Sequence, residues 1–149
     1  MSWYDSAVFY HIYPLGLCGC AHENDGRAVP GAFRKLDAWA AHAWQLGCNA
    51  IYIGPLFESG SHGYDTVDYR RVDRRLGSNE EFAAWVRSCH ARGQKVIVDG
   101  VFNHVGRGFF AFQDLKQHRE GSAYRDWFCD VNFWGNNEYN DGFSYANWG

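Results

Sequence analysis

The sequence predicts an α/β fold with a parallel sheet, and two observations carry that prediction. Short apolar segments alternate with segments of helical periodicity, in the order strand, helix, strand, helix, strand. The connections from each helix to the next strand are short, as in right-handed βαβ units. The chain has 149 residues, 46% of them hydrophobic, and a domain of this length buries roughly 70% of its unfolded surface. A domain with its own core is therefore expected.

Three runs of β-branched and aromatic residues are the expected strands, because such residues suit a pleated, half-buried surface. Residues 8–13 end at Pro14, and residues 50–53 end at Gly54-Pro55. The third run covers residues 95–101. The sequence thus predicts three parallel strands in one sheet.

Two segments carry apolar residues at helical spacing. The first covers about residues 31–46 and stops before Gly47, a residue type common after helix C-termini. The second follows Ser78, which forms a capping-box pattern with Glu81, and stops at Gly93. The apolar faces consist of Phe33, Leu36, Ala40, Ala43, Phe82, Trp85, Val86 and Cys89.

Charge and composition exclude several classes of partner. The net charge is −3, and the paired arginines at 70–71 and 74–75, which flank Asp73, are interpreted as a solvated face, so no nucleic-acid partner is expected. No run of 18 apolar residues predicts a membrane span, and the first residues lack the pattern of a signal peptide. The odd set of five cysteines indicates reduced thiols in a cytoplasmic protein. These cysteines are Cys18, Cys20, Cys48, Cys89 and Cys129.

Polar residues follow the third expected strand, in the segment from Asp99 to His104. This segment places a carboxylate, the amide of Asn103 and an imidazole at or just beyond the strand end. Parallel sheets and barrels meet their ligands at the carboxyl ends of the strands, so the segment is a candidate site. The alternative is that these residues only cap a loop.

A long loop after the second strand carries a second candidate site. It contains Tyr64 and Asp65, preceded by Gly63, which allows a sharp backbone turn. An aromatic ring offers an apolar face to pyranose C–H groups, and a carboxylate accepts hydroxyl protons, so the pair suits a sugar. The alternative is a surface aromatic beside a turn residue.

Residues 105–149 have a different character from the rest of the chain. They are rich in aromatic residues, asparagine and glycine, with little clear periodicity. The composition does not resemble that of a linker. It indicates either a small irregular subdomain or a lid.

Five ordered motifs resemble glycoside hydrolase family 13, the α-amylase family, and within it the cyclomaltodextrinase, neopullulanase and maltogenic amylase branch. Residues 8–14 resemble the first strand of its catalytic barrel, and residues 62–69 resemble the segment closing the non-reducing side of its cleavage subsite. Residues 99–104 resemble its first signature region. Residues 109–114 and 124–128 resemble the start of its inserted domain B.

The resemblance implies an architecture. Residues 1–104 would be the amino-terminal portion of a (β/α)8 TIM barrel, comprising its first three βα units, and residues 105–149 would begin the irregular domain B. The implied reaction is retaining hydrolysis of α-1,4-glucosidic bonds in maltooligosaccharides, cyclodextrins or starch. The implied partners are the α-glucan substrate and the remaining part of the barrel, in cis or in trans.

The resemblance also implies residue roles. Tyr64 would stack on the sugar whose bond is cut, Asp65 would hold its hydroxyls, and His104 would bind its primary hydroxyl. Asp99 would be a structural carboxylate that joins neighbouring loops. Asn103 corresponds to a calcium ligand in many members, but calcium takes six to eight oxygens, so one carbonyl is not a site.

No metal or cofactor is therefore expected. Residues 22–26, where some relatives bind calcium, lack the Asp-x-Asn-x-Asp spacing of those relatives. The other histidines, with His62 among them, are interpreted as packing or surface residues. These others are His11, His42, His90 and His118.

The catalytic carboxylates are expected elsewhere. In this family the nucleophile, the acid/base and a third carboxylate follow later strands, beyond Gly149. Retaining hydrolysis needs two carboxyl groups about 5–5.5 Å apart, so the isolated chain is expected to position substrate without cleaving it. A non-catalytic sugar-binding or assembly piece is one alternative. A metal-dependent hydrolase using His104 and Asp99 is another, but it would need further ligands such as a His-x-His pair, which the sequence lacks.

Overall fold

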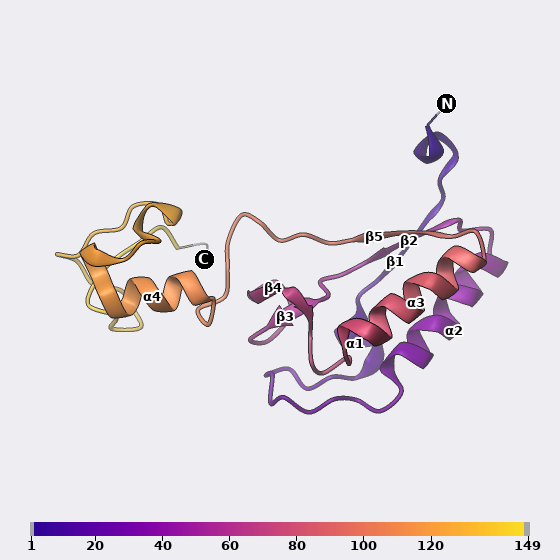
Figure 1. Cartoon of the computed structure of the whole chain (residues 1–149), viewed down its shortest axis with the longest axis horizontal. Helices are drawn as coiled ribbons and strands as arrows, with labels where there is room; N and C mark the ends of the chain where they lie inside the picture. Colours follow the sequence, from indigo (N-terminus) through magenta and orange to yellow (C-terminus); the bar gives the residue numbers. More distant parts are fainter. Residues whose placement is uncertain (1, 148–149) are drawn as a thin grey trace. The chain divides into compact units, whose positions relative to one another are not determined.

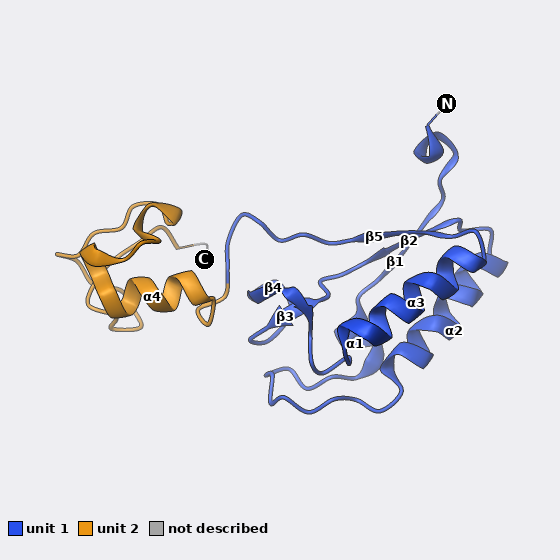
Figure 2. Ribbon diagram, in the orientation of Figure 1, with its two compact units in different colours: residues 1–105 blue, residues 106–149 orange. Residues whose placement is uncertain are grey.

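A computed structural model describes residues 2–147, so Trp148 and Gly149, at the end of the segment expected to begin domain B, lie outside the described residues. The chain divides into two compact units, residues 1–105 and residues 106–149 (Figure 2). Within residues 2–147, no helix combines the length and the apolar character that crossing a membrane requires.

The first unit is built on a parallel sheet in the order β1-β2-β5 (Figure 1). The strands are β1 (Phe9–Ile12), β2 (Ala50–Ile53) and β5 (Lys95–Val98). All three predicted strands are confirmed, although β5 ends at Val98, before Asp99. Pairing aligns Ile12 with Ile53 and Ile53 with Val98, so the carboxyl ends of the strands are level.

Two long helices pack on the sheet and confirm the predicted helical segments. They are α2 (Ala32–Gln45) and α3 (Asn79–Ala91). Their buried apolar residues form one core with those of the strands. The capping box at the start of α3 is present: the Glu81 amide donates to Ser78 Oγ at 3.2 Å, and the Ser78 amide donates to the Glu81 carboxylate at 2.9 Å.

Four elements of the first unit were not predicted. A short helix, α1 (Pro14–Cys18), begins at the proline that was expected only to stop a strand. The loop after β2 folds into an antiparallel hairpin of β3 (Phe57–Ser59) and β4 (Thr66–Val72). A 3-10 turn covers Trp3–Ser6. The hairpin matters most, because it carries Tyr64 and Asp65 in its connection.

The second unit contains α4 (Phe110–His118) and two 3-10 turns, Arg119–Gly121 and Arg125–Trp127. The prediction of little periodicity is wrong for α4, which buries Ala111, Phe112 and Leu115 on one side. The remaining described residues of this unit are mostly irregular, with one bridge between Asn132 and Ser144. Assignment of this unit to the start of a domain B stays a prediction.

Candidate sugar-binding site

Polar and aromatic residues gather where the parallel strands end. Tyr13 directly follows β1, and Asp99 directly follows β5. The ladder continues one step past the strands, because the Gly54 amide donates to the Ile12 carbonyl at 3.1 Å and the Asp99 amide donates to the Ile53 carbonyl at 2.9 Å. A Cβ on Gly54 would overlap the Cβ of Asp99, so only glycine fits this close approach.

Two rings stack on the face of the sheet away from the helices. His11 of β1 and Tyr52 of β2 are paired in the sheet, and their ring centroids lie 4.7 Å apart. Burial raises the pKa of Tyr52, and hydrogen bonding to Asp99, the charge of Asp99 and the charge of Tyr64 raise it further. Asp99 and Tyr64 therefore both act on the Tyr52 hydroxyl. His11, which was interpreted as a packing or surface residue, is exposed and belongs to this cluster.

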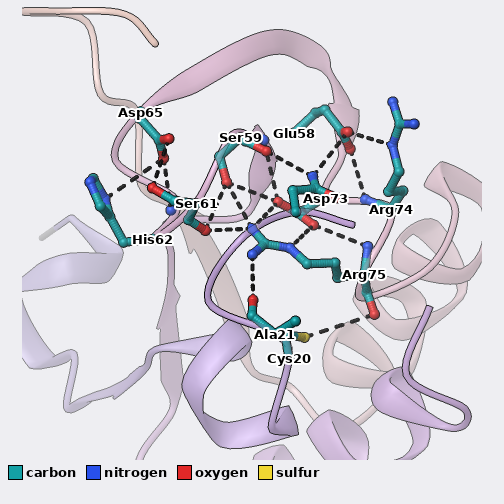
Figure 3. Close-up of polar contacts among 12 residues, drawn as sticks. Cys20, Ala21, Glu58, Ser59, Ser61, His62, Asp65, Asp73, Arg74 and Arg75 are labelled. Atoms are coloured by element: carbon teal, nitrogen blue, oxygen red, sulfur yellow. Dashed lines mark hydrogen bonds and ion pairs between the residues drawn. The ribbon is translucent and has the colours of Figure 1, made fainter. Parts of the chain in front are cut away.

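The connection between β3 and β4 holds Asp65 by both carboxylate oxygens. The Ser61 hydroxyl donates to Oδ2 at 2.9 Å, and the Gly63 amide donates to Oδ1 at 3.2 Å (Figure 3). His62 Nδ1 lies 3.7 Å from Oδ1. The Tyr64 side chain is 41% exposed. This connection thus places a fixed carboxylate next to an accessible aromatic ring.

Tyr13 ties the end of β1 to the same connection. Its hydroxyl donates to the His62 carbonyl at 3.0 Å. Burial raises the pKa of Tyr13; Arg75 opposes this effect, whereas the charges of Tyr64 and Asp65 add to it. The first strand and the connection therefore meet at one place, with Tyr13 between them.

A buried ion pair lies under the connection. Arg75 and Asp73 are 1% and 0% exposed, so the interpretation of the arginines at 70–75 as a solvated face is wrong for Arg75. Arg75 donates from Nε to Asp73 Oδ1 at 2.8 Å and from Nη2 to Oδ2 at 2.7 Å. Figure 3 shows this pair among the backbone carbonyls that surround it. Burial is tolerated because each charge is fully hydrogen-bonded.

The segment after β5 is fastened to the hairpin by Tyr69 of β4. The Tyr69 hydroxyl donates to the Val101 carbonyl and to the His104 carbonyl, the latter at 3.3 Å. The Tyr69 and Phe102 ring centroids lie 5.5 Å apart. The His104 backbone is thereby fixed, while Asn103 is exposed. The structure groups Tyr64, Asp65 and Asp99 around the strand ends, and the role of the His104 ring stays a prediction.

Asn24, within residues 22–26, makes its side-chain contacts inside the chain. Asn24 uses its amide group as a donor, to the Ser59 carbonyl at 2.7 Å and to Glu58 Oε1 at 3.2 Å, and its Oδ1 accepts from the Gly26 amide at 3.0 Å. Among residues 2–147 there is no group of three His, Cys, Asp or Glu side chains that could hold a metal ion. Asn24 thus docks this loop onto β3.

Sequence reasoning missed several residues of this site. Tyr13 and Tyr52 had a signal, since one ends a predicted strand and the other sits in the strand beside His11. Arg75 had none, because its partners other than Asp73 come from segments 14 to 54 residues away in sequence. Only the folded chain brings those partners together.

Comparison with known proteins places the chain in a family. Residues 30–149 match the family model described as "Alpha amylase, catalytic domain". A cyclomaltodextrinase from a Bacillus species is 36% identical over 146 residues, covering 85% of this chain and 25% of that protein. The intracellular maltogenic amylase of Bacillus subtilis strain 168 is 33% identical over 145 residues, covering 85% of this chain and 24% of that protein. The chain therefore spans about a quarter of the length of these relatives.

A solved structure has a similar fold. The acarbose-soaked debranching enzyme of Nostoc punctiforme superimposes with a TM-score of 0.80 at 34% identity, covering 99% of this chain and 35% of that one. The resemblance predicted from the sequence is confirmed. With the family match over most of its length, this chain belongs to the alpha-amylase catalytic domain family.

Proposed function

We propose that this chain forms the substrate-positioning part of a glycoside hydrolase that acts on α-1,4-linked glucans such as maltooligosaccharides and cyclodextrins. One observation carries the proposal: the Asp65 carboxylate is fixed by Ser61 and Gly63, directly beside the exposed ring of Tyr64. A ring that covers one face of a pyranose and a carboxylate that accepts its hydroxyls together orient a glucose unit. The names of the relatives, cyclomaltodextrinase and maltogenic amylase, support an α-glucan as the ligand.

Each site residue has its own task in this proposal. Tyr64 stacks on the glucose unit at the scissile bond, Asp65 accepts hydrogen bonds from its hydroxyls, and the His104 ring binds its primary hydroxyl. Asp99 is structural: it bonds to Tyr52 and keeps the ends of β2 and β5 together. Asn103 belongs to the same loop and holds no metal by itself.

The chemistry belongs to other parts of the enzyme. A retaining glycosidase needs one carboxylate as nucleophile and a second carboxyl group as acid and then base. We infer that these groups, and a third carboxylate, come from the remaining part of a (β/α)8 barrel, in cis or in trans. Residues 1–104 then supply the first three βα units, and residues 105–149 begin domain B. Positioning the glucose unit lowers the barrier because the entropy of alignment is lost on binding, before bond cleavage.

A cytoplasmic location is part of the proposal. It is supported by the relative from Bacillus subtilis that is named as an intracellular enzyme. Fractionation of the source cells, with detection of the chain by antibody, tests it. Recovery of the chain from the culture medium would contradict this location.

Isothermal titration of the 149-residue chain with acarbose, maltotriose and cellotriose tests the proposal. We expect the two α-linked ligands to bind and the β-linked cellotriose to bind at least about tenfold more weakly, since stacking and hydroxyl contacts depend on the linkage geometry. Asp65→Asn and Tyr64→Ala should each weaken acarbose binding about tenfold or more. Asp126→Asn, a matched exposed carboxylate in the second unit, should leave it unchanged.

Three outcomes would count against the proposal. Equal affinity for maltotriose and cellotriose would remove the α-glucan specificity. Unchanged binding in both site variants would remove the assigned roles. Hydrolysis of p-nitrophenyl maltoside by the chain alone would show that the catalytic carboxylates lie within it.

A further inference from the structure

The Arg75 guanidinium is surrounded by oxygen atoms from three segments of the chain. Besides its two bonds to Asp73, it donates to two backbone carbonyls before α2, those of Ala21 at 2.7 Å and His22 at 3.2 Å. It also donates to Ser59 Oγ at 3.0 Å and to the Ser61 carbonyl at 2.6 Å. Figure 3 shows these bonds converging on one side chain. A single fixed cation thus joins the loop after α1, the end of β3 and the turn after β4.

Asp73 completes the arrangement without leaving a charge unpaired. Its Oδ2 accepts from the Ser59 hydroxyl at 2.9 Å and from the Ser59 amide at 3.3 Å, while Oδ1 accepts from the Arg75 amide at 3.0 Å. A buried ion pair adds little net stability compared with apolar packing, because desolvation offsets the attraction. What such a pair supplies is a defined geometry for the groups that it bonds.

A single residue, Ser61, connects the Arg75 guanidinium to the proposed sugar site. The carbonyl of Ser61 accepts from Arg75, and the hydroxyl of the same serine donates to Asp65 Oδ2 at 2.9 Å. On the other side, the next carbonyl, that of His62, accepts from Tyr13. The backbone at residues 61–62 is therefore held from both sides, and Asp65 takes its position from that backbone.

We propose that Arg75 is a positioning residue for the sugar site, acting through Ser61 to fix the carboxylate of Asp65, without touching the sugar itself. This inference rests on the function proposed above. Lysine cannot replace arginine here, because one ammonium group has three donors on one atom and cannot reach carbonyls on several sides at once. Arg71 is exposed in the same strand region and serves as the matched control position.

The test uses the full 149-residue chain and two independent measurements. The first is amide hydrogen exchange at residues 59–65. We expect Arg75→Lys to speed exchange there about tenfold or more, since local opening becomes easier when the hydrogen bonds of Arg75 are lost. Arg71→Lys should leave exchange unchanged. Ser61→Ala is the milder second variant, because it removes only the hydroxyl link to Asp65. Unchanged exchange at residues 59–65 in Arg75→Lys would overturn the inference.

The second measurement is acarbose affinity in a double-mutant cycle. Arg75→Lys and Ser61→Ala should each weaken binding, Arg75→Lys by about tenfold. In the Asp65→Asn background, neither should weaken it further, because their effect passes through that carboxylate. Equal losses in both backgrounds would mean that Arg75 serves only the stability of the fold, and would overturn the inference. If Arg75→Lys does not fold, the Ser61→Ala cycle decides.

Failure of the proposed function can be told apart from failure of this inference. If the unaltered chain binds no α-glucan, the proposed function fails. The exchange measurement alone then tests whether Arg75 fixes residues 59–65. If the chain binds acarbose but exchange at residues 59–65 is the same in all variants, the function stands and the inference falls.

Discussion

Gly63 lies against the ring of Pro55: a Cβ built on this glycine would stand 2.5 Å from Pro55 Cγ. The backbone of Gly63 has φ of +98°, a conformation that side chains disfavour. Pro55 follows β2, and Gly63 belongs to the connection that carries Asp65. The close approach therefore seats this connection directly on the carboxyl end of the sheet.

Gly63→Ala should disturb the connection without unfolding the chain. The left-handed backbone and the contact with Pro55 should together cost about 2 kcal/mol in free energy of unfolding. Urea denaturation followed by circular dichroism measures this loss, and acarbose titration should show weaker binding. Gly121→Ala is the control, since a Cβ there meets nothing within 4 Å. Equal stability of Gly63→Ala and the unaltered chain would contradict the prediction.

Asp141 should make the second unit sensitive to acid. Although burial raises its pKa, hydrogen bonds from Lys116, Arg107 and Asn137 lower the pKa below its ordinary value of 3.8. A carboxyl group whose pKa is lower in the folded state stabilises the fold above its unfolded pKa, and this contribution is lost as pH falls through the folded value. Stability should therefore decline from about pH 5 downward.

Asp141→Asn isolates this contribution. Because the side chain is 3% exposed and bonds to two cations, the variant should lose about 2 kcal/mol at pH 7. The difference in free energy of unfolding between the two proteins should shrink toward pH 3, because the unfolded chain takes up a proton at Asp141 before the folded chain does. Urea denaturation at both pH values measures it, with Asp126→Asn as the control. A gap that is as large at pH 3 as at pH 7 would rule out the titration of Asp141 as its cause.

Ser78→Ala should destabilise α3 by about 1 kcal/mol, because it removes the acceptor for the Glu81 amide at the first turn. Ser78→Asp keeps an acceptor and adds a charge that suits a helix N-terminus, so it should retain most of the stability. Thermal and urea denaturation compare the variants. If alanine and aspartate give the same loss, the cap has no part in stability.

The cysteines should differ sharply in reactivity. Burial raises the pKa of Cys18 to about 11, so only about one Cys18 in a thousand is thiolate at pH 8. Cys129 is exposed. Ellman's reagent should therefore modify Cys129 first and Cys18 only on unfolding. Cys129→Ser should remove the fast phase, and a fast phase that survives in this variant would show that another thiol is accessible.

The regular elements could be predicted because their signals are local. The helix at residues 31–46 was visible from its apolar spacing, and it folds as Ala32–Gln45. The capping box fixed the start of α3 from two residues. The strands were visible because β-branched runs stop at proline or glycine.

The hairpin was missed because its signals are weak. Its six-residue connection, residues 60–65, lacks a two-residue turn of the Asn-Gly kind. β4 carries exposed Arg70 and Arg71 within an otherwise half-buried strand, so alternation is blurred. Tyr64 and Asp65 could be proposed as candidate site residues from their residue types, but the hydrogen bonds that hold Asp65 could not be predicted.

The Arg75 position shows the limit of local reasoning most clearly. In the sequence, Arg75 stands next to Arg70, Arg71 and Arg74 and resembles one more surface charge. Of these four arginines, it is the one that is fully buried. Half of its six acceptor atoms are backbone carbonyls, which carry no residue-specific signal in a sequence. Burial of such a charge follows from where three loops meet, and that is a property of the whole fold.

The outer strands of the sheet set a condition for handling this chain. Within the described residues, β1 and β5 each pair only with β2, so each has one side of backbone amides and carbonyls without a strand neighbour. Free strand sides of this kind recruit further strands. The protein concentration, or a polypeptide that docks on these sides, should thus govern whether the chain stays monomeric or self-associates. Its apparent stability should then depend on its concentration.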